Sequence, residues 1–403
     1  MDLRERASNM ERQQKHIPQL RFPEFQNDGE WEVKRLGDCL IQAPDYGLNS
    51  PAVPYSTNLP TYLRITDISD DGFFIKEGKT SVDTVLTNEN SLQEGDIVFA
   101  RTGASVGKVY KYRKEDGPLV FAGFLIRIKP DKTKLNSDFL FQFLFSNTYN
   151  RWVEVTSTRS GQPGINSADI ASLQIPLPTL VEQQHIANVL SEIDTLLSAT
   201  KDKLEQLKAY KKGLMQKLFP AHGKTLPEYR FKEFEKDGEW KVKKLGELIV
   251  VNSGKDYKHL NHGNIPVFGT GGYMLSVDDK LSDVDAVGIG RKGTIDKPQY
   301  LKAPFWTVDT LFFLTEIGGN DIRFIYYLSQ TIPWKKYGEQ TGVPSLSKVS
   351  IENLEVIVPS STVEQNKIVQ TLLSLDEEID SLSKKRESIE NYKNGLIQQL
   401  FTK

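Results

Sequence analysis

Two long stretches of the chain repeat apolar residues at spacings that predict helices. From Ile186, spacings of four and three alternate through positions 186, 190, 193, 197, 200, 204, 207, 211, 214 and 218, where only Thr200 and Lys211 are not Ile or Leu. The same spacings recur 182 residues later, from position 368 to position 400, where only Arg386 and Lys393 are not apolar. A period of 3.5 over about five heptads favours a coiled coil, although a single amphipathic helix packed on its own globule is an alternative.

The segments that precede these two helices show a different pattern. Short runs of β-branched and aromatic residues, such as 95–100 and 121–128, are separated by Gly, Pro and Asn. This pattern predicts strands and turns, with a few helices such as Asp138 to Trp152. Each segment is therefore expected to form an α+β globule.

The chain contains the same order of parts twice. Segment 21–38 recurs at 230–247, an offset of 209, and Val181-Glu182-Gln183 recurs as Val363-Glu364-Gln365, an offset of 182. The first copy is therefore about 27 residues longer in its middle, and the whole is a tandem duplication. The expected parts are a polar N-terminal segment (1–20), a first globule (21–178), a central helix (179–219), a second globule (220–359) and a C-terminal helix (360–403).

Connectivity predicts how the two helices pair. The first helix ends where the second globule begins, and the second helix begins where that globule ends, so the helices are expected to run antiparallel. Each globule would then lie at the N-terminal end of its own helix. This predicts two globules in a pseudo-two-fold arrangement, separated by an antiparallel coiled coil whose roughly 38 residues per helix extend about 55 Å.

Composition narrows the class of protein. The chain carries 51 Lys and Arg against 53 Asp and Glu, and the net charge of −2 argues against a generally basic nucleic-acid binder. The single cysteine, Cys39, excludes an internal disulfide, and no apolar run reaches the roughly 18 residues that a membrane helix needs. Residues 1–16 are polar and do not resemble a secretory signal, so a cytoplasmic protein without membrane partners is expected.

Motifs that suggest catalysis do not meet their structural requirements. Gly288–Gly293 matches the dinucleotide-binding fingerprint, but Pro298 would break the helix that must follow it. Gly103–Lys108 is one residue too short for a phosphate-binding loop, and His259 and His262 form a pair without a further metal ligand nearby. The sequence also lacks the motifs of a DNA methyltransferase. We therefore expect no catalytic residue and no metal site.

Basic residues gather in two predicted hairpins. Between Arg101 and Lys134, nine basic residues stand against three acidic ones, which gives a local charge of +6. The corresponding part of the second half has four basic residues and one acidic residue, namely Arg291, Lys292, Lys297, Lys302 and Asp296. Basic hairpins suit contacts with DNA phosphates and base edges. An ordinary solvated hairpin has the same charge pattern and remains the alternative.

Several of these motifs together resemble one family. Residues 95–108, residues 288–311, and the proline followed by Glu182-Gln183 or Glu364-Gln365 before each long helix are similar to the specificity subunits of type I restriction-modification systems. The resemblance extends from about Gln19 to Phe401. It implies two target recognition domains, each of which reads one half of a bipartite, asymmetric sequence in double-stranded DNA. It also implies that the coiled coil sets the spacer and docks the methyltransferase subunits.

The resemblance further implies a chain that is not an enzyme. Methylation and cleavage would belong to two modification (methyltransferase) subunits and to restriction (endonuclease and translocase) subunits of a bacterial or archaeal cell. S-adenosylmethionine, ATP and Mg²⁺ are then expected on those partners only, and no cofactor is expected on this chain. The alternatives are a coiled-coil scaffold that does not bind DNA and a self-sufficient DNA-modifying enzyme.

The candidate DNA-binding residues lie in the basic hairpins and in loops that offer amide, hydroxyl and aromatic groups. In the first half they are Arg101, Thr102, Ser105 and Lys108 of the hairpin, with Tyr46, Asn49, Arg159, Ser160 and Gln162. In the second half they are Arg291 and Lys292 of the hairpin, with Lys255, Tyr257, His259, Gln340 and Thr341. Arginine pairs with guanine through two hydrogen bonds, and asparagine or glutamine pairs with adenine in the same way.

Overall fold

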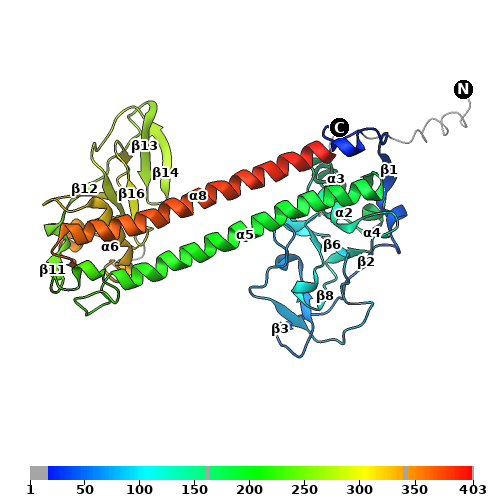
Figure 1. The fold of residues 1–403 in the computed structure, drawn as a ribbon, viewed down its shortest axis with the longest axis horizontal. Coiled ribbons are helices and arrows are strands. Elements are labelled where there is room, and N and C mark those ends of the chain that lie inside the picture. The colour runs from blue at the N-terminus through cyan, green and yellow to red at the C-terminus, as the bar shows by residue number, and fades with distance from the viewer. Residues whose placement is uncertain (1–16, 159–162, 339–343, 402–403) are drawn as a thin grey trace, which may run out of the picture. The chain divides into compact units, whose positions relative to one another are not determined.

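The computed structural model describes residues 17–158, 163–338 and 344–401, and its elements are labelled in Figure 1. The chain divides into two compact units. Unit 1 comprises residues 1–200 with 385–403, and unit 2 comprises residues 201–384. Each unit therefore contains one globular part and one segment of each long helix. Both globular parts mix helices and strands, which confirms the predicted α+β class.

Unit 1 is built on a four-stranded antiparallel sheet with the order β2-β9-β6-β7. A second sheet has the order β3-β5-β4-β8, in which β4 and β8 run parallel, and β1 pairs with β10. The strands are β1 Glu32–Arg35, β2 Asp45–Tyr46, β3 Ala52–Pro54, β4 Thr61–Leu63, β5 Thr80–Val82, β6 Ile97–Ala100, β7 Val109–Lys111, β8 Leu119–Phe121, β9 Leu125–Ile128 and β10 Gln174–Leu177. The helices are α2 Ser137–Phe143, α3 Asn147–Ser157 and α4 Ser167–Ser172, and short 3₁₀ helices lie at Pro23–Phe25, Leu36–Cys39, Ile65–Asp67, Gly103–Ser105 and Lys114–Asp116. In the hydrophobic core of this unit, buried side chains of β6 and β9 pack against buried side chains of α2 and α3.

The single helix that the sequence predicted over residues 138–152 is wrong. The chain forms α2 and α3 instead, and Ser146 separates them with an extended backbone. The Ser146 hydroxyl accepts a hydrogen bond from the backbone N–H of Tyr149. Serine is a favoured residue at a helix start because it satisfies such a free N–H group. A new helix therefore begins after Ser146.

Unit 2 repeats this plan with fewer strands. Its main sheet has the order β12-β18-β15-β16 and is antiparallel, its second sheet has the order β14-β13-β17, and β11 pairs with β19. The strands are β11 Lys241–Lys244, β12 Ile249–Ser253, β13 His262–Gly269, β14 Gly272–Val277, β15 Ala286–Gly290, β16 Gln299–Leu301, β17 Trp306–Thr307, β18 Leu311–Glu316 and β19 Glu355–Val358. The helices are α6 Ile322–Thr331 and α7 Lys348–Glu352, with 3₁₀ helices at Lys232–Phe234, Leu245–Glu247 and Trp334–Lys336.

The strand registers match between the units. Ala100 of β6 faces Leu125 of β9 in unit 1, and Gly290 of β15 faces Leu311 of β18 in unit 2. Ala100 and Gly290 are 190 positions apart, compared with an offset of 209 at the first repeated motif. Most of the additional length of the first copy therefore lies before β6, where unit 1 forms β3, β4 and β5 of its larger second sheet.

An arginine–glutamate pair fastens each globular part to the start of a long helix. In unit 1, Arg21 donates two hydrogen bonds of 2.8 Å to Glu182, whose side chain is fully buried. In unit 2, Arg230 donates two bonds of 2.8 Å to Glu364, which also accepts a bond of 3.0 Å from Trp240 Nε1. Hydrogen bonding to these carboxylates raises the pKa of Arg21 and of Arg230. The repeated motifs are thus explained by a repeated structural contact.

The two predicted long helices are present as α5 Leu180–Leu218 and α8 Thr362–Phe401. In unit 2, Lys211 of α5 pairs with Asp376 in the first half of α8. In unit 1, Asp194 in the first half of α5 pairs with Lys393 of α8. The helices therefore run antiparallel in both units, as the connectivity predicted. No helix in the described part of the chain is both long and apolar enough to cross a membrane.

The predicted seam faces the inside of this helix pair. All ten seam positions of α5 are buried or half-buried, and on α8 only Arg386 is exposed. The two lysines that interrupt the seam are not free. Asp376 accepts a second hydrogen bond from the Tyr327 hydroxyl (2.7 Å), and Asp194 accepts one from Gln142 (2.7 Å). A half-buried polar pair of this kind favours one register of a coiled coil, because a shifted register leaves both charges unpaired.

Candidate nucleic-acid interface

Arg101 and Arg291 occupy the same place in the two units. Each directly follows the last residue of β6 or β15, which is one of the two interior strands of its main sheet. The Arg101 N–H donates to Phe124 O (3.1 Å), and the Arg291 N–H donates to Thr310 O (2.8 Å). The next residues, Thr102 and Lys292, form antiparallel bridges to the segments before α4 and α7. The sequence prediction that the two hairpins correspond is therefore correct in backbone detail.

The side chain of Arg101 is stacked on an aromatic ring. Its guanidinium carbon lies 4.9 Å from the ring centre of Tyr46, another candidate residue. The Tyr46 hydroxyl accepts a hydrogen bond from the backbone N–H of Ser167 (3.2 Å), which fixes the ring beside the start of α4. Arg101 Nε is buried without a hydrogen-bond partner among the described residues. The structure thus brings half-buried Arg101 and the exposed ring of Tyr46 together, with half-buried Thr102 next to Arg101 in the chain.

The side chain of Arg291 lies beside an open cavity of about 410 Å³. Lys292 and Lys348 line the same cavity, together with the buried ring of Phe312, which lies 5.8 Å from the Arg291 guanidinium carbon. The other lining residues are Ser253, Ser345, Leu346 and Ser347. None of the described residues that line it is acidic. The sequence had indicated Arg291 and Lys292 but neither Lys348 nor the three serines.

The difference between the two sites comes from one matched position. Tyr46 faces Ile126 across the sheet in unit 1, and Ser253 faces Phe312 in unit 2. The residue that follows is a glycine in both units, and a Cβ on Gly254 would lie 1.9 Å from a backbone oxygen, so the chain must pass the neighbouring strand closely there. Ser253 therefore stands where Tyr46 stands, and the shorter side chain leaves the cavity open.

The first hairpin presents less unpaired positive charge than its sequence count of +6 suggests, because several of its basic residues form ion pairs. Arg127 is 2% exposed, and its guanidinium forms an ion pair with Asp45. Four lysines pair with acidic residues, and three of these acidic residues lie outside the hairpin. The pairs are Lys108 with Asp70, Lys111 with Asp138, Lys114 with Glu94 and Lys134 with Asp131. The charge excess is therefore largely neutralised by residues that lie elsewhere in the sequence. Since Asp70 is exposed, Lys108 can exchange this partner for another anion.

The remaining candidates lie at the ends and loops of the sheets. Ser105 ends the 3₁₀ helix that follows Thr102, and Asn49 is exposed after β2. Lys255 and His259 are exposed, and the His259 ring lies edge-on to Trp306 with ring centres 5.8 Å apart. Tyr257 packs against the core of the second sheet. Arg159, Ser160, Gln162, Gln340 and Thr341 lie outside the described residues.

The motifs that suggested catalysis have other structures. Gly288–Gly290 belong to β15, and the chain then continues to the antiparallel strand β16, with no helix between them. Gly103–Ser105 form one 3₁₀ turn, which is followed by strand β7. Among the residues that the structure describes, no three His, Cys, Asp or Glu side chains gather in a way that could hold a metal ion.

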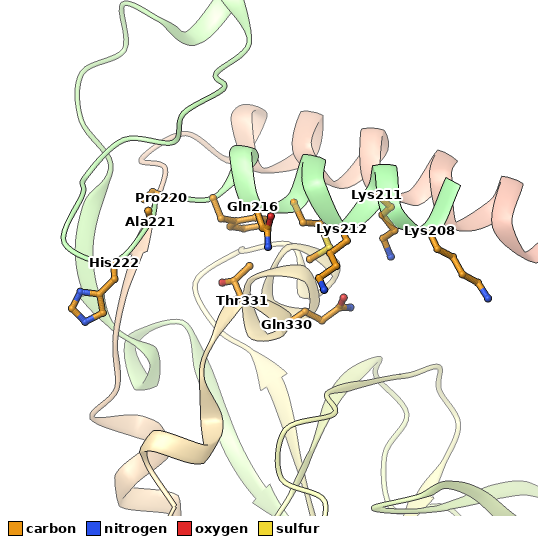
Figure 2. Close-up of a pocket in the computed structure, with 11 residues that line it drawn as sticks. Lys208, Lys211, Lys212, Gln216, Pro220, Ala221, His222, Gln330 and Thr331 are labelled. Atoms are coloured by element: carbon orange, nitrogen blue, oxygen red, sulfur yellow. The ribbon is translucent and has the colours of Figure 1, made fainter. Parts of the chain in front are cut away.

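A larger cavity of about 570 Å³ lies in unit 2 beside the last turns of α5 (Figure 2). Its polar lining includes Lys208, Lys211, Lys212, His222, Gln330 and Thr331. The positions of α8 that match Lys208 and Lys212 at the offset of 182 are Glu390 and Asn394. Of the three lysines of this cavity, only Lys211 is matched by a lysine at the offset of 182, Lys393, so the cavity is not part of the duplicated geometry of the two arginines.

The fold defines a class of proteins with two equivalent domains that arose by duplication. The chain matches the family described as type I restriction modification DNA specificity domain over residues 29–209 and 237–391, and it belongs to that family. It is 25% identical to the type I restriction enzyme MjaVIII specificity subunit of Methanocaldococcus jannaschii, over 96% of this chain and 95% of that protein. It is 26% identical to the StySPI specificity subunit of Salmonella potsdam, over 47% and 42% of the two chains.

The fold is shared with a solved structure. The type I restriction-modification S subunit from M. genitalium aligns with a TM-score of 0.67 and 20% identity, over 96% of this chain and 100% of that chain. At this identity the likeness concerns the fold. It agrees with the duplicated domains and the long helix pair described above.

Proposed function

We propose that this chain is the DNA specificity subunit of a type I restriction-modification complex, and that each globular part reads one half of a bipartite, asymmetric target. The observation that carries the proposal is the matched placement of Arg101 and Arg291 at the same sheet end in two copies of one fold. Arginine is the side chain that most often reads guanine in the major groove and also binds phosphate in a bidentate way. Membership of the specificity family supports the same conclusion.

The long helices suit two further roles in such a complex. As a continuous pair, α5 and α8 would set the spacer between the half-sites, and their outer faces would dock two modification subunits. Tyr210 and Tyr392 support the docking role, because they are 182 positions apart, 60% and 64% exposed, and unused by the packing of the helix pair. Equivalent exposed aromatic residues favour two copies of the same partner.

In this proposal the chain does not catalyse a reaction. Methyl transfer from S-adenosylmethionine, and ATP- and Mg²⁺-dependent cleavage by restriction subunits, belong to the partner proteins in the cytoplasm of a bacterium or archaeon. The near-neutral net charge of −2 fits this division of labour. Partner subunits that enclose the DNA would supply much of the phosphate contact, and this chain would supply mainly the contacts that distinguish bases.

Exchange of one domain tests the proposal. Residues 21–178 are replaced by the corresponding domain of another family member, the protein is co-expressed with its modification subunit, and methylated adenines are mapped by sequencing. One half of the methylated motif is expected to change while the other half stays the same. A change in both halves contradicts the modular reading. A scaffold that does not contact DNA would give no methylated motif that depends on the exchanged domain.

A further inference from the structure

Three cations converge on the cavity beside Arg291. Arg291 and Lys292 are exposed and Lys348 is half-buried, and none of the three has an ion-pair partner among the described residues. In contrast, Lys111 and Lys114 of the first hairpin are paired with carboxylates. Like charges that face one small space repel one another, so the cavity attracts a compensating anion.

The hydrogen-bonding groups of the cavity select the kind of anion. Guanidinium and ammonium groups only donate hydrogen bonds, and the hydroxyls of Ser253 and Ser345 add two donors that can turn toward a ligand. Ser347 is already engaged, because its hydroxyl accepts the backbone N–H of Ser350 at the start of α7. A donor-rich cavity of this composition suits a group that carries several acceptor oxygens and a negative charge.

A phosphodiester group has these properties, and the surroundings favour it over the edge of a base. The backbone of Arg291 and Lys292 is held on both sides, by Thr310 O and by the bridge to Ser345, so the site is rigid in position. Rigid basic groups that anchor the DNA backbone fix the orientation of a recognition domain, whereas bases are distinguished by groups that reach into a groove.

We propose that the cavity of Arg291, Lys292 and Lys348 binds one phosphodiester group of the DNA strand at the second half-site. In the described part of the first recognition domain the corresponding place is filled by an aromatic ring, because Tyr46 occupies the position of Ser253 and stacks on Arg101. The two domains therefore anchor DNA differently although their folds match. This inference rests on the proposed function, since it names the part of the DNA that one of the two sites holds.

The test compares variants of the complex with the modification subunit. R291Q and K348Q each remove one cation of the cavity, and S253Y fills it with the residue of the first domain. K236Q is the control, because Lys236 is an exposed lysine of unit 2 outside the cavity. Binding is measured at several salt concentrations, to a duplex that carries the methylated motif and to a scrambled duplex, and thermal unfolding checks that each variant is folded.

R291Q and K348Q are expected to weaken binding to both duplexes by roughly tenfold at 100 mM salt and to reduce the slope of log K against log salt by about one. S253Y should weaken binding to both duplexes as well, and K236Q should leave the affinity and the slope unchanged. Loss of discrimination at one base pair with an unchanged slope would show base reading and would overturn the proposal. Wild-type affinity and slope in R291Q and K348Q would also overturn the proposal. These two variants decide the question even if S253Y does not fold.

Failure of the proposed function gives a different result. If the wild-type complex bound the motif and the scrambled duplex equally at every salt concentration, the specificity role itself would be wrong. If the wild-type complex is specific and the cavity variants behave like K236Q, only the phosphate site is wrong. The two failures are therefore distinguished within one experiment.

Discussion

The contact of Arg230 with Glu364 predicts a large effect of a single substitution on unit 2. The Glu364 side chain is 1% exposed, and it accepts two hydrogen bonds of 2.8 Å from Arg230 and one of 3.0 Å from Trp240. R230M would leave the buried carboxylate with the Trp240 indole as its remaining described donor. Loss of one partner of a buried ion pair costs about 3 to 5 kcal/mol, and the lower value applies because Arg230 is itself slightly exposed.

The effect should be local, so hydrogen exchange measures it better than global unfolding does. A loss of about 3 kcal/mol corresponds to faster opening by roughly 100-fold. We expect this acceleration for the amides of β11 and β19, which join the globular part of unit 2 to α8. The amides of β1 and β10 in unit 1 are the internal control, because the equivalent ion pair of Arg21 with Glu182 remains intact.

A double variant separates charge burial from lost packing. R230M/E364L replaces both charges by apolar groups, and replacement of a buried ion pair by packed apolar residues is often neutral or stabilising. The double variant should therefore exchange more slowly than R230M. If R230M changed the exchange of β11 and β19 by less than threefold, or if R230M/E364L were as fast as R230M, the buried carboxylate would not be the cause.

Three further predictions concern the helices, a turn and the single thiol. One heptad inserted into both α5 and α8 should lengthen the spacer of the methylated motif by about 3 bp, since seven residues add about 10 Å. Insertion into one helix alone separates Lys211 from Asp376 and should lower stability. An unchanged spacer after the matched insertion would refute the idea that the helix pair sets the spacer length. G254A should lower the midpoint of thermal unfolding, because a Cβ would lie 1.9 Å from a backbone oxygen, whereas G213A in α5 meets no atom within 4 Å and should raise stability by about 0.5 to 1 kcal/mol; equal effects of the two would contradict this. Burial raises the pKa of the Cys39 thiol, so a disulfide reagent at pH 8 should react with the native chain at least about 100 times more slowly than with the urea-unfolded chain, and equal rates would show that Cys39 is accessible.

The long helices and the duplication could be predicted from the sequence because both are periodic. Apolar spacing identified the seam, and the same spacing identified Lys211 and Lys393 as interruptions. Their partners, Asp376 and Asp194, could not be recognised, because each lies more than 160 positions away and beside the apolar positions of the opposite helix. Local sequence patterns predict single helices and strands, whereas contacts between these elements can be recognised only once the fold is known.

The candidate site shows the same limit. Charge counting treated Arg127 as part of a basic surface, yet Arg127 is buried and pairs with Asp45, 82 positions earlier. The cavity beside Arg291 depends on Ser253 at the place of Tyr46, and this equivalence is visible only in the strand registers. Sequence comparison of the halves gives no fixed offset there, because the first copy contains additional residues between the matched positions.

The core of unit 1 has a consequence for the order in which the chain can fold during synthesis. Its buried residues include Leu396, Leu400 and Phe401 of α8, and the Phe401 ring packs edge-on against Phe139 and Phe143 of α2. The ribosome makes these residues about 250 positions after α2. The first recognition domain therefore completes its core only when α8 has been made, after the whole of the second domain. A nascent chain interrupted before Leu396 would lack part of the core of its first domain. In such a stalled product, the domain that was synthesised first would therefore be incompletely folded.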